Sequence, residues 1–248
     1  YVSPDENLES ICKSMLADAS VNEVKLFLKA GATYHLGRQT DMPKALYIMG
    51  QLPEDGEEPA YMEMGNMSIN CADAIIEAFH FENLKIKVTD DNFFKFKNQA
   101  FHVTTFSWKN CEISDLVRTM WYQEVDAPQK QIADKIVIEN CRFFGLNSLL
   151  SGLFGLSIKQ DAPVHNFVFK NSTFHAKDLT KALITGLGSM TGELNVTVEN
   201  CTFVSMAPAA MTFFDLNPKN TSSFNLIVRN NLFSGVCEAG QGTWFTTR

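Results

Sequence analysis

The chain has 248 residues, 45% hydrophobic and 11% aromatic, and its 28 acidic and 21 basic side chains give a formal net charge of −7. This composition supplies a large core and excludes a disordered chain. The acidic balance argues against nucleic acid as a partner, because phosphate binding needs a basic surface. No apolar run approaches the roughly 20 residues of a membrane span, and six cysteines are too sparse for a disulfide scaffold.

The first 20 residues predict a helix that caps the fold. Ser3, Pro4 and Glu6 have the spacing of a capping-box start. An apolar stripe at helical spacing follows, formed by Leu8, Ile11, Cys12, Met15 and Leu16. No charged segment followed by an apolar one precedes this helix, so no signal peptide is visible.

Residues 21–78 are expected to form the first coils of a β fold. Val24–Leu28 and Ala45–Gly50 are short apolar runs, and the second is closed by glycine. The acidic stretch Glu54–Glu58 is interpreted as a solvated turn. Ca²⁺ is possible but has no motif, because it needs several oxygens that converge in space.

Residues 79–248 contain a repeat that is marked by asparagine. A short strand-like segment ends at an asparagine six times, at Asn83, Asn110, Asn140, Asn171, Asn200 and Asn230. The first interval is 27 residues, and the others are 30, 31, 29 and 30 residues. Three positions after each asparagine stands an apolar residue, namely Ile86, Ile113, Phe143, Phe174, Phe203 or Phe233. This regularity indicates a coil that returns to the same place about every 30 residues.

Stacking of the coils in register is expected to form columns of equivalent residues. The inward column contains Phe81, Trp108, Ile138, Phe169, Val198 and Val228. The residues before the asparagines alternate in sign, as Glu82, Lys109, Glu139, Lys170, Glu199 and Arg229. Parallel stacking in register places these opposite charges side by side. Cys111, Cys141 and Cys201 share an inward position and are expected to be buried thiols.

Weaker strands are predicted on another face of each coil. They are Phe94–Asn98, Leu149–Phe154, Ala182–Gly186, Met211–Phe214 and Thr243–Thr246. Leucine-rich repeats have shorter periods, and a propeller blade needs more residues than the repeat provides. The sequence therefore predicts an all-β fold, a right-handed parallel β-helix, as one domain over residues 1–248. Its last strands have no evident cap, so self-association at the C-terminal edge is possible.

The coil sequences resemble those of the pectin-lyase-like β-helix superfamily. The segment VKLFLKAGATYHLG is similar to the first coil of such proteins, and VIENCRFFG, FVFKNSTFHA, VTVENCTFVS and LIVRNNLFSG are similar to later coils. The chain looks most like uncharacterised secreted β-helix domains of gut bacteria, which often accompany polysaccharide-utilisation genes. The resemblance implies a secreted, periplasmic or cell-surface bacterial protein with a polysaccharide or acidic glycan as its partner.

The catalytic motifs of that superfamily are largely missing. Its galacturonan hydrolases combine Asn-Thr-Asp, Asp-Asp, Gly-His-Gly and Arg-Ile-Lys, of which this chain has only Asp90-Asp91. Its pectate lyases carry Arg-x-Pro-x-x-Arg beside a Ca²⁺ cluster, and that segment does not occur. A lone Asp-Asp pair is more often part of a turn than of a hydrolytic site, which needs two suitably separated carboxyl groups.

A glycan-binding groove is expected where loops of neighbouring coils stack. The candidate residues are Arg118, Trp121, Tyr122, Asn147, His175, Lys177 and Lys181. Trp121 and Tyr122 could stack on sugar rings, and the cations could meet acidic sugars; the alternative is that Trp121 packs under its own loop.

Three functions remain open at this point. The first is a polysaccharide-binding or surface-assembly module without a recognisable catalytic set. The second is a polysaccharide lyase or glycoside hydrolase with a non-standard site. The third is a structural or adhesive solenoid. No metal or other cofactor is implied by a motif.

Overall fold

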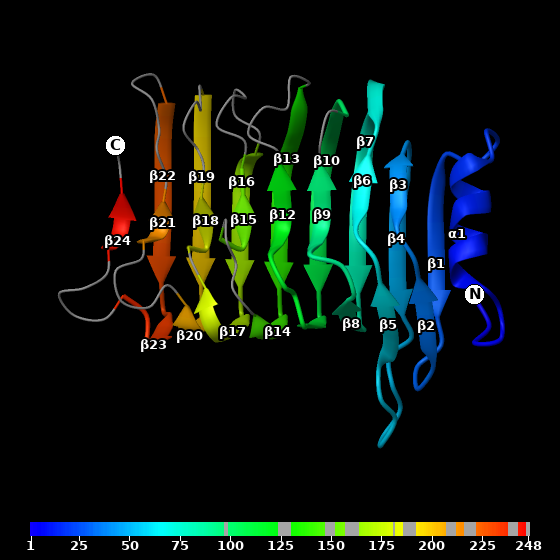
Figure 1. Cartoon of the computed structure of the whole chain (residues 1–248), viewed down its shortest axis with the longest axis horizontal. Coiled ribbons are helices and arrows are strands. Elements are labelled where there is room, and N and C mark those ends of the chain that lie inside the picture. The colour runs from blue at the N-terminus through cyan, green and yellow to red at the C-terminus, as the bar shows by residue number, and fades with distance from the viewer. Residues whose placement is uncertain are drawn as a thin grey trace.

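The chain forms an all-β parallel solenoid (Figure 1). Its computed structural model describes residues 1–96, 99–123, 130–146, 152–156, 164–180, 182–185, 192–206, 212–215, 222–237 and 243–246. In this part of the chain, three parallel sheets of eight strands each run along the stack. We call them sheets A, B and C, in the order in which the chain visits them.

The three sheets follow one another within every coil. Sheet A contains β1 (Glu23–Leu28), β4 (Ala45–Gly50), β7 (Cys71–Glu82), β10 (Phe101–Lys109), β13 (Gln131–Glu139), β16 (Val164–Lys170), β19 (Gly192–Glu199) and β22 (Ser222–Arg229). Sheet B contains β2 (Thr33–Leu36), β5 (Ala60–Met64), β8 (Leu84–Val88), β11 (Glu112–Ser114), β14 (Arg142–Leu146), β17 (Thr173–Thr180), β20 (Thr202–Met206) and β23 (Leu232–Ser234). Sheet C contains β3 (Gln39–Met42), β6 (Met67–Ile69), β9 (Asn92–Phe96), β12 (Thr119–Gln123), β15 (Phe154–Gly155), β18 (Ile184–Thr185), β21 (Thr212–Asp215) and β24 (Thr243–Thr246). The weaker strands expected on another face therefore form sheet C, although parts of their predicted ranges lie outside the described residues.

The helix α1 (Leu8–Ala17) lies at the β1 end of the stack (Figure 1). It starts later than the sequence predicts, because Asn7 rather than Ser3 caps it, and the side chain of Asn7 accepts the Ser10 N–H at 2.9 Å. The predicted capping residues form a separate turn, in which the Ser3 N–H donates to the Glu6 carboxylate at 2.6 Å. Leu8, Cys12 and Leu16 are buried and join the core of the solenoid.

The six marker asparagines lie in one row and bend the chain from sheet A into sheet B. Their φ angles fall between 49° and 56°, the left-handed region that asparagine tolerates better than other side chains. Their side-chain amides also bond to one another: Asn110 donates to Asn83 at 3.0 Å, and Asn140 donates to Asn110 at 3.2 Å. The prediction of a coil stacked in register is therefore confirmed.

Gly50 ends β4 where a marker asparagine would otherwise stand. A Cβ atom at this position would lie 2.2 Å from the carbonyl oxygen of Asn83, so only glycine fits beneath the first asparagine of the row. The row consequently begins at Asn83, whose side chain donates to the Gly50 carbonyl at 3.4 Å.

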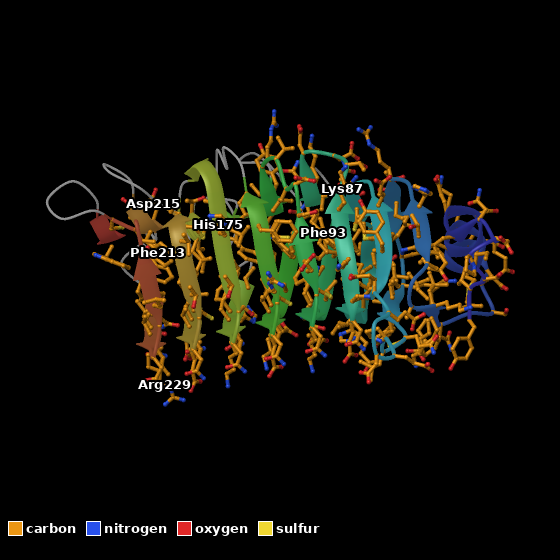
Figure 2. The ribbon with its side chains drawn as sticks, turned by 90° about the horizontal axis from the view of Figure 1, so that it is seen from below. Lys87, Phe93, His175, Phe213, Asp215 and Arg229 are labelled. Carbon is orange, nitrogen blue, oxygen red and sulfur yellow. The ribbon has the colours of Figure 1, made fainter. Side chains whose placement is uncertain are left out.

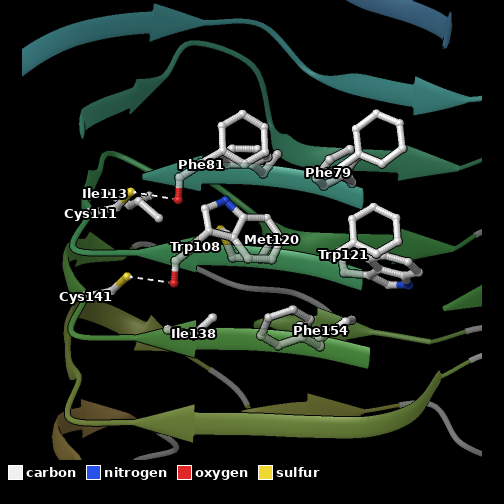
Figure 3. Close-up of a cluster of buried hydrophobic side chains, with 14 of the residues drawn as sticks. Phe79, Phe81, Trp108, Cys111, Ile113, Met120, Trp121, Ile138, Cys141 and Phe154 are labelled. Carbon is white, nitrogen blue, oxygen red and sulfur yellow. Dashed lines mark hydrogen bonds between the residues drawn. The ribbon is translucent and has the colours of Figure 1, made fainter. Parts of the chain in front are cut away.

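Stacked side chains fill the interior. Phe81, Trp108 and Ile138 occupy consecutive levels of the inward column and are fully buried (Figure 3). A second column on sheet B stacks Phe143 on Phe174 with ring centroids 4.8 Å apart, and Phe174 on Phe203 at 5.0 Å. Burying a side chain of this size contributes about 1.5–3 kcal/mol, so these columns are a major source of stability.

The alternating charges and the cysteines occupy the columns that the sequence predicts. Glu199 lies between Lys170 and Arg229, with nitrogen–oxygen distances of 3.6 and 2.8 Å. Cys111 and Cys141 are buried and free, and their thiols donate to the carbonyl oxygens of Phe81 and Trp108 at 3.5 and 3.4 Å (Figure 3). Burial raises the pKa of Cys111 well above its usual value, which keeps this thiol protonated.

The left-handed backbone at Asn140 predicts that Asn140→Ala lowers the stability of the protein more than Asn140→Gly does. Alanine pays about 1–2 kcal/mol for that backbone conformation and also loses the amide bond to Asn110, whereas glycine loses only the bond. Urea unfolding of the two variants measures the difference. Equal losses of stability would show that the backbone conformation is not what asparagine supplies.

Candidate functional site

The corner between sheets B and C carries a polar hollow. It has a volume of about 520 Å³. We call it the corner hollow, and its charged and amide side chains include Arg38, Asp41, Asn66, Asp90, Asp91 and Lys95. These residues come from three successive coils, which meet at this corner because the sheets stack in register.

An ion pair that joins the first of these coils to the third forms one wall of the hollow. The Nε and Nη2 atoms of Arg38 donate to the two carboxylate oxygens of Asp90 at 2.8 and 2.7 Å. The Asn66 N–H from the intervening coil donates to the same carboxylate at 2.9 Å. This geometry needs glycine at position 65, because a Cβ atom there would lie 2.8 Å from the Arg38 nitrogen and 3.0 Å from the Asp90 carboxylate.

These contacts determine the protonation state of Asp90. The hydrogen bonds from the Arg38 guanidinium, helped by the Asn66 N–H, lower the pKa of the Asp90 carboxyl below its ordinary value, although partial burial opposes them. Asp90 is therefore ionised at neutral pH and its acceptors are occupied. A general acid for glycoside hydrolysis needs the opposite shift, so Asp90 is suited to shaping the hollow rather than to donating a proton.

Asp91 and Arg118 extend the hollow toward the next coil. The Arg118 N–H donates to the Asp91 carbonyl at 2.8 Å, and its side chain approaches the Asp91 carboxylate at 3.3 Å. Both side chains are about half exposed. Opposite them, Asp41 has a φ of 56° and accepts a hydrogen bond from Gln99 at 3.2 Å.

A row of outward side chains on sheet C continues from the hollow. We call it the sheet C column, and by register it runs through Lys95, Tyr122, Gly155, Thr185 and Asp215. Ser68, which is buried, follows Met67, the partner of Phe94, and therefore stands next to Lys95. Ser68 and Lys95 line the hollow as well. Tyr122 stands between Lys95 and Gly155 in register and is half-buried, whereas Gly155 is buried.

The residues predicted for the groove are not gathered in one place. Arg118 contacts Asp91 of the corner hollow and Tyr122 belongs to the sheet C column, but His175 is exposed on sheet B. Trp121 is fully buried and packs on Phe96 and Phe106, with ring centroids 4.5 and 4.7 Å apart, so it cannot stack on a ligand.

Three other predicted residues lack a described side chain. Asn147 and Lys181 lie outside the described residues, and Lys177 is placed only by its backbone in β17. Sequence reasoning in turn missed Arg38, Asn66 and Lys95. The available signal was alignment of the first coils, which the missing asparagine at Gly50 hides.

Two histidine clusters lie on the outer face of sheet A. His102 and His165 both contact one carboxylate oxygen of Asp134, at 2.9 and 3.4 Å. His80 lies between Ser107 at 2.5 Å and Glu82 at 3.0 Å. Among the described residues, no three His, Cys, Asp or Glu side chains are arranged to hold a metal ion. These histidines join neighbouring strands of sheet A.

Comparisons with known proteins add no relative. A scan of family models finds no match for the chain, and searches of curated proteins and of solved structures find none either. Within the described residues, no helix is long and apolar enough to span a membrane.

The variant Asp90→Asn is expected to be less stable than the parent protein by an amount that depends on pH. At pH 7 the free energy of unfolding should fall by about 1 kcal/mol, because the neutral side chain no longer forms an ion pair with Arg38. The contribution of Asp90 is complete above the unfolded pKa of about 3.9 and is lost as the pH falls through the lower native pKa.

Thermal unfolding at pH 7 and in strong acid tests this expectation. The gap between Asp90→Asn and the parent protein should close in acid, where both side chains are neutral. The exposed Asp5→Asn serves as a matched control that leaves stability unchanged. A gap that persists in acid would mean that the ion pair is not its cause.

Proposed function

We propose that this solenoid is an extracytoplasmic bacterial module that binds a polysaccharide at the corner hollow and along the sheet C column. The single observation that carries the proposal is the continuity of the two surfaces through Lys95, which lines the hollow and pairs with Tyr122 in the column. A long polar ligand needs such a track, whereas a small ligand needs only a pocket.

The side chains of the hollow suit a ligand rich in hydroxyl groups. Each sugar hydroxyl both donates and accepts, and the hollow offers carboxylates, amides, hydroxyls and cations within one surface. Tyr122 adds an aromatic ring on the same face, and an aromatic ring provides a flat apolar contact with a polar edge. Lys95 offers a partner for an acidic group of the glycan expected from the sequence, although the carboxylates of Asp41, Asp90 and Asp91 outnumber the two cations of the hollow.

The ionised state of the Asp90 carboxylate favours binding over catalysis. Its carboxylate is held ionised by Arg38 and by the Asn66 N–H, so Asp90 is unsuited to the role of proton donor in hydrolysis. A lyase or hydrolase with a different site is the second candidate, and formation of product from a bound glycan would favour it. A purely structural or adhesive solenoid is the third.

The proposal includes the finer identity of the fold. The coil sequences support a right-handed helix of the pectin-lyase-like superfamily, and the buried face of α1 supports a role as the cap of the first coil. Solenoids need such caps because an uncovered coil exposes its core to water.

Tyr122→Ala is expected to weaken glycan binding about two- to tenfold, which is the range for losing one aromatic contact. Tyr47→Ala is the matched control, because Tyr47 lies on the outer face of sheet A. A glycan array of acidic and neutral polysaccharides, followed by calorimetry on the best ligand, measures both variants. Equal affinities would remove the sheet C column from the binding site.

The role of the corner hollow in binding is tested with the variant Lys95→Ala. A product assay on the parent protein tests separately for catalysis. The variant should lose affinity for acidic polysaccharides more than for neutral ones, because the ammonium group can pair only with an acidic sugar. Release of shortened or unsaturated sugars by the parent protein would overturn the binding-module proposal in favour of an enzyme.

A further inference from the structure

A serine, a histidine and a glutamate form a chain of hydrogen bonds on the outer face of sheet A. The Nδ1 atom of His80 lies 2.5 Å from the hydroxyl oxygen of Ser107, and its Nε2 atom lies 3.0 Å from a carboxylate oxygen of Glu82. Ser107 is the register partner of His80 on β10, and Glu82 follows His80 by two residues on the same face of β7. The strand pairing therefore holds the three side chains together.

The glutamate determines which ring nitrogen of His80 carries the proton. An ionised carboxylate only accepts hydrogen bonds, so the Nε2–H of His80 donates to Glu82. In the neutral ring Nδ1 is then an acceptor, and the Ser107 hydroxyl donates to it. The hydroxyl proton of Ser107 is thus directed at a base, which is the arrangement that activates a serine as a nucleophile.

His80 and Ser107 are not products of the repeat. In the four later coils the same position is occupied by side chains that are apolar or carry no ionisable group, namely Val137, Val168, Thr197 and Ile227. Glu82, by contrast, is the first member of the row of alternating charges, whose last member, Arg229, points away from the ribbon in Figure 2. An apolar residue would serve stacking equally well at this position, so the base and the hydroxyl beside Glu82 need a chemical explanation.

The surroundings of Ser107 restrict the substrate. The residue is only 5% exposed, and the ring of His80 packs against that of Tyr47 with centroids 6.0 Å apart. A hydroxyl group so covered is within reach of a small acyl group but not of a bulky one. Lys109 follows Ser107 by two residues on the same face of β10, so its ammonium group provides a positive charge for an oxyanion that forms at Ser107.

We propose that Ser107, His80 and Glu82 form a nucleophilic site that cleaves esters of small carboxylic acids such as acetic acid. The Ser107 oxygen bonds to the ester carbonyl carbon, and its proton passes to Nδ1 of His80. The bond between that carbon and the alcohol oxygen breaks, and the alcohol leaves with the proton. Water then attacks the acyl group on Ser107 by the same route, which releases the free acid and returns a proton to the hydroxyl.

Each residue has one role in this site. Ser107 is the nucleophile and His80 is the base, whereas Glu82 is a positioning residue that orients the ring. The site lies on sheet A and shares no residue with the corner hollow or the sheet C column. Its failure would therefore leave the proposed glycan binding unaffected.

Para-nitrophenyl acetate is the probe, and mass spectrometry of peptides from the treated protein identifies the side chain that carries the acetyl group. Ser107 should be acetylated in the parent protein, because the reaction passes through an acyl intermediate on its hydroxyl. The variant Ser107→Ala should lose both this label and the release of nitrophenol by the protein. Ser114→Ala is the matched control, since Ser114 lies on the outer face of sheet B, and it should change neither.

The variant His80→Gln keeps a side-chain donor for Glu82 but removes the base. Acetylation of Ser107 should slow about 10²–10⁴-fold, the range for one general base. In the parent protein the rate should rise with pH as the imidazole loses its proton, and His80→Gln should lose this dependence. Glu82→Gln should slow the reaction but keep the pH dependence, because the base is still present.

Thermal unfolding and circular dichroism check that the variants are folded. An unlabelled Ser107 in the parent protein would overturn the proposal without reference to any variant. Equal rates of acetylation in the parent protein and in folded His80→Gln would also overturn it, because the hydroxyl would then react without its base.

Discussion

The left-handed backbone at the end of each sheet A strand is the constraint on which the stack depends. Most L-residues adopt this conformation at a cost, and asparagine does so more readily than most. The chain supplies asparagine at six successive levels. The same side chain also bonds to the level beneath it, as Asn110 does to Asn83. Bend and register are therefore fixed by one residue type, and the apolar columns align because the bends align.

This constraint explains why the fold could be predicted in part from the sequence. A residue that must recur at each bend leaves a visible period, and the alternating charges from Glu82 to Arg229 follow the same period. Local choices within one coil leave no such trace. Asn7 and Ser3 are both good helix caps, and the sequence pattern favoured Ser3 although Asn7 begins α1. Similarly, Trp121 and Tyr122 are adjacent aromatics, and only the pleat of β12 decides which one is buried.

The corner hollow could not be predicted from the sequence, for a different reason. Its central ion pair joins Arg38 to Asp90, which are 52 residues apart, and passes over Gly65 of the coil between them. Arg38 belongs to no recognisable motif, Asp90 belongs only to an isolated Asp-Asp pair, and the first coils lack the asparagine that would have aligned them. Contacts that skip a level depend on the small size of the residue in between, which no periodicity records.

The corner hollow and the charge column, which is the row of alternating charges from Glu82 to Arg229, follow from the same stacking but differ in how they can change. A residue of the hollow is held by neighbours on both sides, so altering Asp90 disturbs Arg38 and Asn66 together. A residue of the charge column makes exposed ion pairs only, so Arg229 can change its sign while Glu199 keeps its pairing with Lys170. A single charge of this column can therefore be substituted at little cost to the fold. In the hollow, by contrast, recognition and stability depend on the same side chains.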